Sequence, residues 1–373
     1  LVVTVDPAAR DFLYGSAGAD EFVEADARQF VVDGAGGTDT LLLPRHTGIL
    51  DANSLGAAMH STMVGGKEVI TFGDLVFTDI EVLHFQLDGD RSINVRVVGA
   101  GGYSSIAEAS ASAASGDLIF VTKTAESQHT ATISAGCAGA SLGLYIETGY
   151  AGTLKLTMAE GDTALKGLYL FGDVAVNVTA NSLSNVIVGN DAANTIYGLD
   201  GNDVLIGGHG DRLYGGNGND VMAVVEGGAF LSGGAGNDRM INAALDGDWV
   251  TMFGGTGSDV IQIAGRQQGV DQGISRTTVG DLSVRDVVDM SLLLGGNGEA
   301  LYSIDGSKIV SESGSTYLDL SGLQATTGGQ HGTGVSLQDS VVEFVNATTS
   351  TVDTDMMFDA DPFASGYQHH SIE

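Results

Sequence analysis

The chain has 373 residues, 43% of them hydrophobic, and its 15 Lys+Arg against 47 Asp+Glu give a formal net charge of −32. A charge of this sign repels phosphate backbones and anionic membrane surfaces, which excludes nucleic-acid binding and favours cations as partners. The hydrophobic share supports a buried core, and no apolar run reaches the roughly eighteen residues that predict a membrane span. The single cysteine, Cys137, rules out an intramolecular disulfide framework and a cysteine-based zinc site.

Residues 1–98 are predicted to form an N-terminal β-rich segment with two glycine-rich turns. The sequence starts without Met, a basic region or an apolar stretch of the kind found in signal peptides, so we expect a chain that is processed or cut from a longer one. The nine-residue units GSAGADEFV and GAGGTDTLL place Asp20 and Asp39 sixth, after small residues that favour a turn. The segment FTDIEVLHFQLDG, residues 77–89, is predicted to be a closing strand.

Residues 99–188 are predicted to form a short right-handed parallel β-helix with a capping helix. Ser105 and Glu108 make a capping box before an alanine-rich run, Gly116 ends that run, and the strand-forming LIFV follows. Apolar pulses separated by Gly, Asp or Asn then lie at Ala131–Ile133, Leu142–Ile146, Leu154–Leu156, Leu168–Phe171 and Val174–Val178. A β-sandwich is the alternative for this segment.

Residues 189–263 repeat in nine-residue units with glycine early, aspartate sixth and an apolar residue eighth. The units are GLDGNDVLI from Gly198, the shortened GGHGDRLY from Gly207, GGNGNDVMA from Gly215, GGAGNDRMI from Gly233 and GGTGSDVIQ from Gly254. Gly215 and Gly233 are 18 residues apart, the length of two units. This spacing predicts a two-sided roll with two units in each turn.

The chemistry of the unit predicts a site for a hard cation. Glycine lets the backbone adopt positive φ and turn its carbonyls inward, the apolar residue points into the core, and the aspartate faces the carbonyl oxygens. The candidate metal ligands are Asp203, Asp220, Asp238 and Asp259, the turn glycines Gly198, Gly201, Gly215, Gly218, Gly233, Gly236, Gly254 and Gly257, and also Asp20, Asp39 and Asp211. The deletion in GGHGDRLY shifts the register of Asp211.

These units resemble RTX (repeats-in-toxin) haemolysin-type calcium-binding repeats. The resemblance implies that stacked GGxGxD turns hold Ca²⁺ between successive coils through aspartate carboxylates and backbone carbonyls. It also implies export through a type I route with a C-terminal secretion signal, to a secreted, extracellular or cell-surface location. A flexible glycine-rich linker is the alternative, and the in-phase copies argue against it. We therefore expect an all-β parallel β-solenoid, in which a short β-helix runs into an RTX β-roll between β-rich flanking segments.

Residues 264–373 are predicted to be a C-terminal β-rich segment. Strand-like pulses lie at Ser291–Leu294, Thr316–Leu320 and Val341–Val345. The unit GGNGEALYS from Gly295 carries Ala300 in place of aspartate, which predicts a turn without a metal.

The sequence has no HExxH, GxSxG or phosphate-loop motif, which favours a protein that is not an enzyme. We expect a structural or adhesive protein (an S-layer subunit, filament or matrix component) that folds and assembles with Ca²⁺. Its expected partners are calcium ions, further copies of itself in a homo-oligomer, lattice or filament, and a cell-surface polysaccharide. The alternatives are the β-helix and RTX part of a secreted polysaccharide lyase or epimerase, and a non-catalytic fragment of an RTX toxin.

Overall fold

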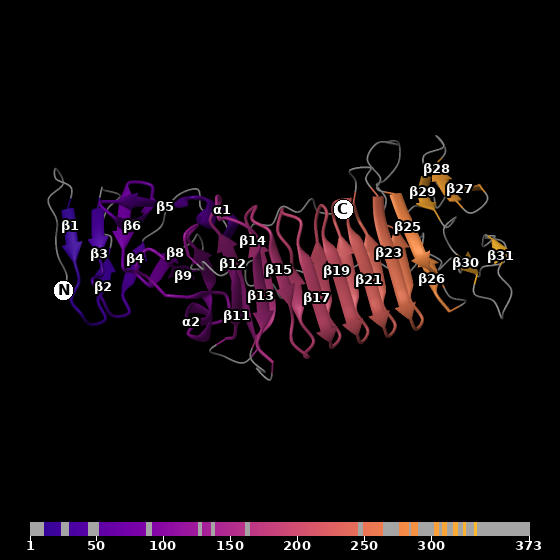
Figure 1. The fold of residues 1–373 in the computed structure, drawn as a ribbon, viewed down its shortest axis with the longest axis horizontal. Helices are drawn as coiled ribbons and strands as arrows, with labels where there is room; N and C mark the ends of the chain where they lie inside the picture. The colour runs from indigo at the N-terminus through magenta and orange to yellow at the C-terminus, as the bar shows by residue number, and fades with distance from the viewer. Residues whose placement is uncertain are drawn as a thin grey trace. The chain divides into compact units, whose positions relative to one another are not determined.

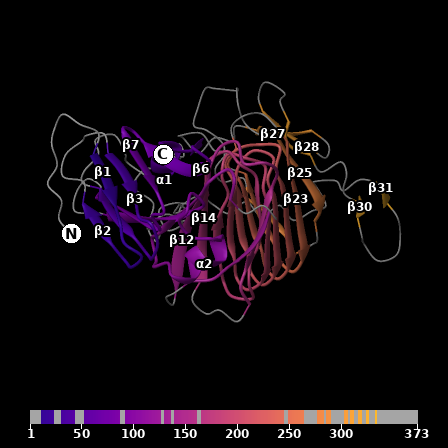
Figure 2. The same cartoon turned by 60° about the vertical axis from the view of Figure 1, so that its left-hand side comes forward.

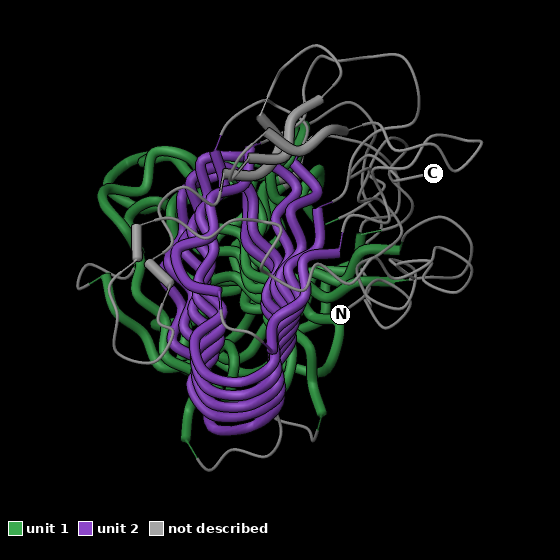
Figure 3. The backbone as a smooth tube through the Cα atoms, turned by 90° about the vertical axis from the view of Figure 1, so that its right-hand side faces the viewer, with its two compact units in different colours: residues 1–176, 353–373 green, residues 177–352 purple. Residues whose placement is uncertain are grey.

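The computed structural model describes residues 11–23, 30–43, 52–86, 92–125, 129–135, 139–160, 165–244, 249–263, 276–282 and 285–289, with short strands between 302 and 333. The chain divides into two compact units, residues 1–176 with 353–373 and residues 177–352 (Figure 3). Strands dominate both units, and the predicted all-β parallel β-solenoid is confirmed. Among the described residues, no helix has the length and apolar character needed to cross a membrane.

The first unit begins with a short two-sided roll, which we call the N-terminal roll. One parallel sheet contains β1 (Asp11–Tyr14), β3 (Phe30–Asp33) and β7 (Leu75–Thr78), and the other contains β2 (Glu21–Val23), β4 (Thr40–Leu43) and β8 (Val82–Gln86). Leu41, Leu83 and Phe85 are buried between the sheets. The predicted closing strand is therefore β8, and it completes a third coil.

An insertion separates the second coil of the N-terminal roll from the third. It contains α1 (Ala52–Ala57), β5 (Met59–Val64) and β6 (Lys67–Phe72), and β6 pairs antiparallel with both β5 and β7. The hairpin between β5 and β6 turns at Gly65 and Gly66, both with positive φ. Because this insertion lies between two successive coils, the regular spacing of the roll is lost in the sequence.

The predicted β-helix follows a reversal of chain direction. β9 (Ser92–Val98) pairs antiparallel with β8 and parallel with β10 (Leu118–Val121). The parallel pairs continue with β12 (Ala140–Ile146), β14 (Leu165–Phe171), and, in the facing sheet, β11 (Thr130–Ile133) and β13 (Leu154–Met158). Parallel pairing of this kind does not occur in a β-sandwich of antiparallel sheets, so the alternative is excluded.

The predicted capping helix is α2 (Ile106–Ala111), which is labelled in Figure 2. It packs against β9, β10 and β11. Ser105 is its N-cap residue, and the Ser105 Oγ accepts a hydrogen bond from the Glu108 backbone N–H at 3.1 Å. The Glu108 carboxylate accepts from the backbone N–H of Ser104, one residue earlier than the capping box predicts. The helix ends at Ala111 with Ser112 as its C-cap, so Gly116 does not end it as predicted; with a φ of 89°, Gly116 lies in the turn that leads to β10.

The second unit is a regular roll, which we call the central roll, and its strands lie side by side in Figure 1. One wall contains β15 (Val176–Thr179), β17 (Thr195–Asp200), β19 (Arg212–Asn217), β21 (Phe230–Ala235), β23 (Trp249–Thr256) and β25 (Arg276–Asp281). The other contains β16 (Val186–Val188), β18 (Val204–Gly207), β20 (Val221–Val224), β22 (Arg239–Asn242), β24 (Val260–Ile263) and β26 (Val287–Asp289). The apolar eighth residues of the repeats, such as Leu205 and Met222, are buried as predicted.

Beyond the central roll, β29 (Thr316–Asp319) pairs parallel with β25 and antiparallel with β28 (Lys308–Ser311), which pairs with β27 (Tyr302–Asp305). A two-stranded sheet of β30 (Gln324–Ala325) and β31 (Gly332–Thr333) follows. The predicted strands at Ser291–Leu294 and Val341–Val345 and the unit from Gly295 lie outside the described residues. The predicted boundaries after residues 98, 188 and 263 stay predictions.

Candidate metal centre

The turns of the central roll depend on glycine at positions where the backbone has positive φ. The third glycine of each unit, Gly201, Gly218, Gly236 or Gly257, has a φ between 132° and 146°. Residues that carry a side chain rarely adopt this backbone conformation, which explains why glycine recurs there. Leu199 stands where the unit from Gly198 lacks a glycine, and it also has a positive φ, of 76°.

The first glycine of each unit is needed for a different reason, because a side chain would fill a space lined by oxygen atoms. A Cβ atom placed on Gly198 would collide with the Asp203 Oδ2 atom and with the carbonyl oxygen of Gly215 in the next coil. The same pair of oxygen atoms, one carboxylate and one carbonyl, borders the space beside Gly215 and Gly233. The structure thus repeats one oxygen-lined space from coil to coil.

The Oδ1 atoms of the repeat aspartates connect successive coils. The Asp203 backbone N–H donates to Asp220 Oδ1 at 2.8 Å, and the Asp220 N–H donates to Asp238 Oδ1 at 2.8 Å. The Asp238 N–H continues the series with Asp259 Oδ1 at 2.9 Å. Each carboxylate is therefore held in one orientation by the coil before it, with its Oδ2 atom directed toward the first glycine of its own turn.

The Oδ2 atoms of Asp203, Asp220, Asp238 and Asp259 are buried, and within the described part of the chain none of them has a hydrogen-bond partner. These four residues are each 1% exposed. A buried carboxylate oxygen without a partner carries a large desolvation penalty. A cation beside each oxygen would remove that penalty.

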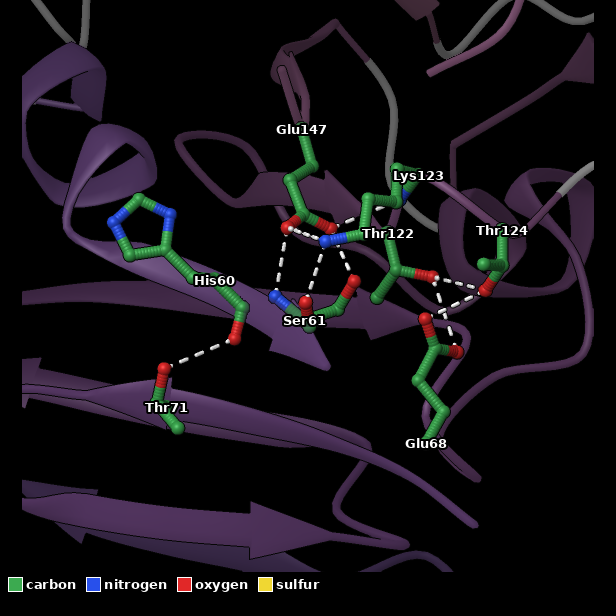
Figure 4. A network of polar contacts seen from close by, with 8 residues as sticks. All are labelled: His60, Ser61, Glu68, Thr71, Thr122, Lys123, Thr124 and Glu147. Carbon is green, nitrogen blue, oxygen red and sulfur yellow. Dashed lines mark hydrogen bonds and ion pairs between the residues drawn. The ribbon is translucent and has the colours of Figure 1, made fainter. Parts of the chain in front are cut away.

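Glu147 shows how protein groups satisfy a buried carboxylate elsewhere in this chain (Figure 4). Glu147 is 3% exposed, and the backbone N–H and Oγ of Ser61 donate to its two oxygens at 2.7 and 2.5 Å. The Lys123 backbone N–H donates at 2.9 Å, and the Lys123 ammonium lies 3.4 Å from Oε1. Among the residues described, no lysine and no other group donates a hydrogen bond to the Oδ2 atoms of these four repeat aspartates.

Burial controls the electrostatics of the central roll. Burial, together with the charge of neighbouring carboxylates, raises the pKa of Asp203 to about 7 and the pKa of Asp238 to about 6. Burial also raises the pKa values of Asp220 and Asp259. These carboxylates are therefore expensive to ionise in the folded chain unless a positive charge lies beside them.

The donor set fits calcium. Ca²⁺ takes six to eight oxygen ligands from carboxylates, backbone carbonyls and water, and it tolerates irregular geometry. The space beside Gly198, Gly215 or Gly233 offers one buried carboxylate oxygen and at least one carbonyl oxygen. No group of three or more His, Cys, Asp or Glu side chains gathers among the described residues, so the arrangement relies on backbone oxygen rather than on a side-chain cluster.

A comparison with known protein families matches the RTX calcium-binding nonapeptide repeat (4 copies) at residues 179–211, 210–224 and 225–243. The central roll is an array of RTX repeats. RTX repeats bind Ca²⁺ in general, so the fit of the donor set and the family agree. The coil from Gly254 lies beyond the matched residues, yet its Asp259 has the same buried Oδ2 and the same Oδ1 bond. A search among curated proteins found no match to the chain.

Asp211, in the shortened RTX repeat, differs from the four aspartates above. Its Oδ1 accepts from the Asn194 backbone N–H at 2.7 Å, and its Oδ2 accepts from the Gly208 backbone N–H at 2.8 Å. Both oxygens of this buried carboxylate are therefore already hydrogen-bonded, Oδ1 to the preceding coil and Oδ2 within its own turn. Burial still raises the pKa of Asp211 to about 6.

The two predicted aspartates of the N-terminal roll also differ from each other. Asp39 is 0% exposed, and its Oδ2 has no hydrogen-bond partner among described residues, as in the RTX roll. The Asp20 Oδ2 instead accepts from the backbone N–H and the Oγ of Ser16, at 2.6 and 2.9 Å. These two hydrogen bonds lower the pKa of Asp20.

Sequence reasoning missed several residues of the turns. Asp286 continues the carboxylate series, because its Oδ1 accepts from the Asp259 backbone N–H at 3.0 Å. The Asp281 carboxylate accepts from the backbone N–H groups of Gly254 and Gly255, at 2.7 and 3.0 Å. Asp281 and Asp286 follow an insertion and belong to no nine-residue unit. A search of the sequence with a repeat period long enough to include the insertion could have found these two aspartates.

Proposed function

We propose that this chain is a secreted RTX-type protein with a structural or adhesive role, whose central roll is completed by bound calcium. The observation that supports the proposal is the stack of four buried Oδ2 atoms, at Asp203, Asp220, Asp238 and Asp259, that have no partner within the described residues. Bound Ca²⁺ would supply the positive charge that these oxygens lack. The first glycine of each turn keeps the adjoining space open.

Calcium would then act on folding. Without a cation, four like-charged carboxylates lie buried in successive coils, and their repulsion and desolvation oppose the folded state. The glycines that the turns require also lose more conformational entropy on folding than other residues do. A cation that binds the folded roll and not the unfolded chain stabilises the roll in proportion to RT ln(1 + [Ca²⁺]/Kd).

An extracellular polysaccharide is the partner that we propose for the adhesive role. The outer face of the β17–β25 wall has an aromatic row in which Tyr197 stacks on Tyr214 with ring centroids 4.8 Å apart. Tyr197 and Trp249 are 42% and 40% exposed, and the Arg276 guanidinium lies 5.5 Å from the Trp249 ring centre. Exposed aromatic rings beside an arginine suit an acidic sugar polymer, because the rings can stack on sugars and the guanidinium can pair with a carboxylate.

A matched pair of glycine variants tests the calcium proposal. Gly215→Ala places a methyl group against Asp220 Oδ2 and the Gly233 carbonyl. Gly208→Ala instead meets the Asn190 carbonyl oxygen at 3.6 Å and Glu226 Oε2 at 3.9 Å, both ordinary contacts. We expect Gly215→Ala to weaken calcium binding to the roll about tenfold or more, and Gly208→Ala to leave it near the wild-type value. Calorimetric calcium titration of the full-length variants measures this difference.

Circular dichroism of the wild-type chain completes the test. We expect β-structure to increase when calcium replaces a chelator, and to a smaller degree in Gly215→Ala at the same calcium concentration. A wild-type chain that binds no calcium, or equal affinities for the two glycine variants, would contradict the proposal.

A further inference from the structure

The N-terminal roll repeats the geometry of the RTX roll, although it lies outside the residues that match the family. The Asp20 backbone N–H donates to Asp39 Oδ1 at 2.8 Å, as the Asp203 N–H donates to Asp220 Oδ1. Gly37 has a φ of 133°, close to the 132° of Gly201. The turn of GAGGTD thus adopts the conformation of an RTX turn even though its second glycine is replaced by Ala35.

Asp39 is buried and directed into an oxygen-lined space. Its exposed fraction is 0%, and its Oδ2 is one of the buried carboxylate oxygens without a hydrogen-bond partner in the described segments. A Cβ atom on Gly34 would lie 2.6 Å from Asp39 Oδ2 and would collide with the backbone carbonyl oxygen of Asp79. Glycine is therefore required at position 34 by the same two kinds of oxygen atom as at Gly198.

The coil that closes this space is not a nine-residue repeat. It comes from the tight turn Asp79–Glu81 after the inserted hairpin, and Asp79 presents its carbonyl from a backbone with a φ of 52°. Glu81 stands where the next repeat aspartate would stand, because its Oε2 accepts from the Asp39 backbone N–H at 2.6 Å. The Lys67 ammonium lies 2.6 Å from the Asp79 carboxylate and 3.0 Å from the Asp33 carboxylate, so it offsets part of their combined charge. Asp39, which borders Gly34, and Glu81 add two further carboxylates.

We propose that Gly34, Asp39 and the Asp79 carbonyl form a second calcium centre, separate from the RTX roll. The bound ion would join the second and third coils of the N-terminal roll across the inserted residues 44–74. The first coil is not part of this centre, because Ser16 already occupies the Oδ2 atom of Asp20. The inference does not depend on the repeats of the central roll, whose aspartates lie in the other compact unit.

Three variants of the full-length chain test the proposal. Asp39→Asn keeps the shape of the side chain and removes its charge, and Gly34→Ala fills the oxygen-lined space. Gly36→Ala is the matched control, because a Cβ atom on Gly36 has nothing within 4 Å. Native mass spectrometry at saturating calcium counts the bound ions, and we expect Asp39→Asn and Gly34→Ala to bind about one ion fewer than the wild type and Gly36→Ala to bind the same number.

Hydrogen exchange shows which turn has lost its ion, and it also reveals whether a variant has misfolded. Calcium should slow exchange of the amides in residues 34–39 in the wild type and in Gly36→Ala, and should leave them unchanged in Asp39→Asn. Unchanged stoichiometry in Asp39→Asn, or calcium protection of this turn in that variant, would overturn the second centre. Calcium protection of the central roll in the same spectra would show that the calcium binding on which the proposed function depends still holds, so the two failures can be told apart.

Discussion

The two carboxylate oxygens of Asp220 lie in different surroundings. Oδ1 accepts a hydrogen bond from the Asp203 backbone N–H in the preceding coil, whereas Oδ2 has no partner among the described residues. One oxygen therefore orients the aspartate, and the other is the oxygen that the proposed cation would bind. Asn194 shows the contrast in the same roll, because its side-chain amide donates to Asn190 Oδ1 and to the Ala192 carbonyl.

The buried aspartates predict that pH controls both calcium binding and the stability of the calcium-free chain. The folded pKa of Asp203, about 7, lies above its unfolded value near 3.8, so the calcium-free fold binds protons more tightly than the unfolded chain. Stability of the calcium-free protein should therefore rise as the pH falls from above 7 toward 4. Calcium competes with these protons, so we expect the increase in Tm that calcium causes to shrink steadily as the pH falls from 7.5 to 5. Thermal unfolding with and without calcium at each pH measures this increase.

Asp203→Asn is the control for this pH dependence, because it removes one of the groups that titrate near neutral pH. Its calcium-free Tm should change less between pH 7.5 and pH 5 than that of the wild type. A calcium-induced shift in Tm that is the same at both pH values would contradict the assignment of these carboxylates to the metal.

For single residues, the spacing of the repeats predicts which residues lie in the turns, but it predicts little about the hydrogen bonds that each of them makes. The in-phase units place Asp203, Asp220 and Asp238 correctly at equivalent turn positions, because the period is local and regular. Spacing could not show that Asp211 binds Gly208 through Oδ2, since a one-residue deletion changes a turn in a way that only the backbone geometry decides. Glu81 could not be found either, because it lies 42 residues from Asp39.

Between elements, a second set of side chains connects the turns on the solvent side. The fifth residue of each repeat accepts the backbone N–H of the fifth residue in the next coil: Asn202 Oδ1 accepts from Asn219, and Asn219 Oδ1 accepts from Asn237, at 2.8 and 2.7 Å. Ser184 Oγ begins the series with Asn202 N–H at 3.0 Å, and Ser258 N–H ends it at Asn237 Oδ1. This exposed ladder keeps the turns in register while the aspartates do so from inside.

We expect Asn219→Ala to destabilise the calcium-bound chain by about 0.5–1.5 kcal/mol, the usual net contribution of one such hydrogen bond. Asn217→Ala is the matched control, because Asn217 donates from its side chain only to the exposed Asp200 carboxylate at 2.7 Å. Chemical denaturation at saturating calcium measures both free energies of unfolding. Equal losses in the two variants would show that the ladder between coils adds nothing beyond an ordinary surface contact.

Sequence predicted the elements of the central roll better than those of the N-terminal roll. In the central roll each coil takes 17 to 21 residues between equivalent aspartates, so the pairing of neighbouring strands follows from the period. In the N-terminal roll Val31 pairs with Val76 across the inserted helix and hairpin, and no local period reports that contact. The antiparallel pairing of β8 with β9 reverses the chain direction, and alternation of apolar residues carries no information on direction.

For the whole molecule, the net charge of −32 and the parallel coils both indicate that the chain needs a partner that stabilises the fold. Self-repulsion of so many carboxylates opposes both compaction and association, and the proposed calcium ions would reduce it at the turns where the repeat aspartates are buried. A solenoid also needs something at its ends, since each coil is stabilised by its neighbours. Helix α2 packs against β9 and β10 in the first unit, whereas β26 is the last strand of its sheet among the described residues of the second.

We therefore expect calcium to drive self-association of the full chain. Divalent cations neutralise and bridge acidic surfaces, and a last strand such as β26 offers backbone groups that a second copy can pair with. Light scattering should show ordered oligomers, a lattice or filaments at millimolar calcium, and dispersal when a chelator is added. Magnesium is the matched control, because it screens charge equally well but keeps its water ligands and demands octahedral geometry, so it should not replace calcium.

The alternative reading of the chain as part of a polysaccharide lyase or epimerase makes the opposite prediction. Such an enzyme would stay monomeric at millimolar calcium and would depolymerise or epimerise an acidic polysaccharide. Light scattering across the calcium titration, paired with assays on alginate- and pectin-like polymers, separates the two. A structural and adhesive protein should instead assemble with calcium and bind these polymers without converting them. We expect the binding because the side chains of Tyr197 and Trp249 are exposed and can stack on a sugar chain.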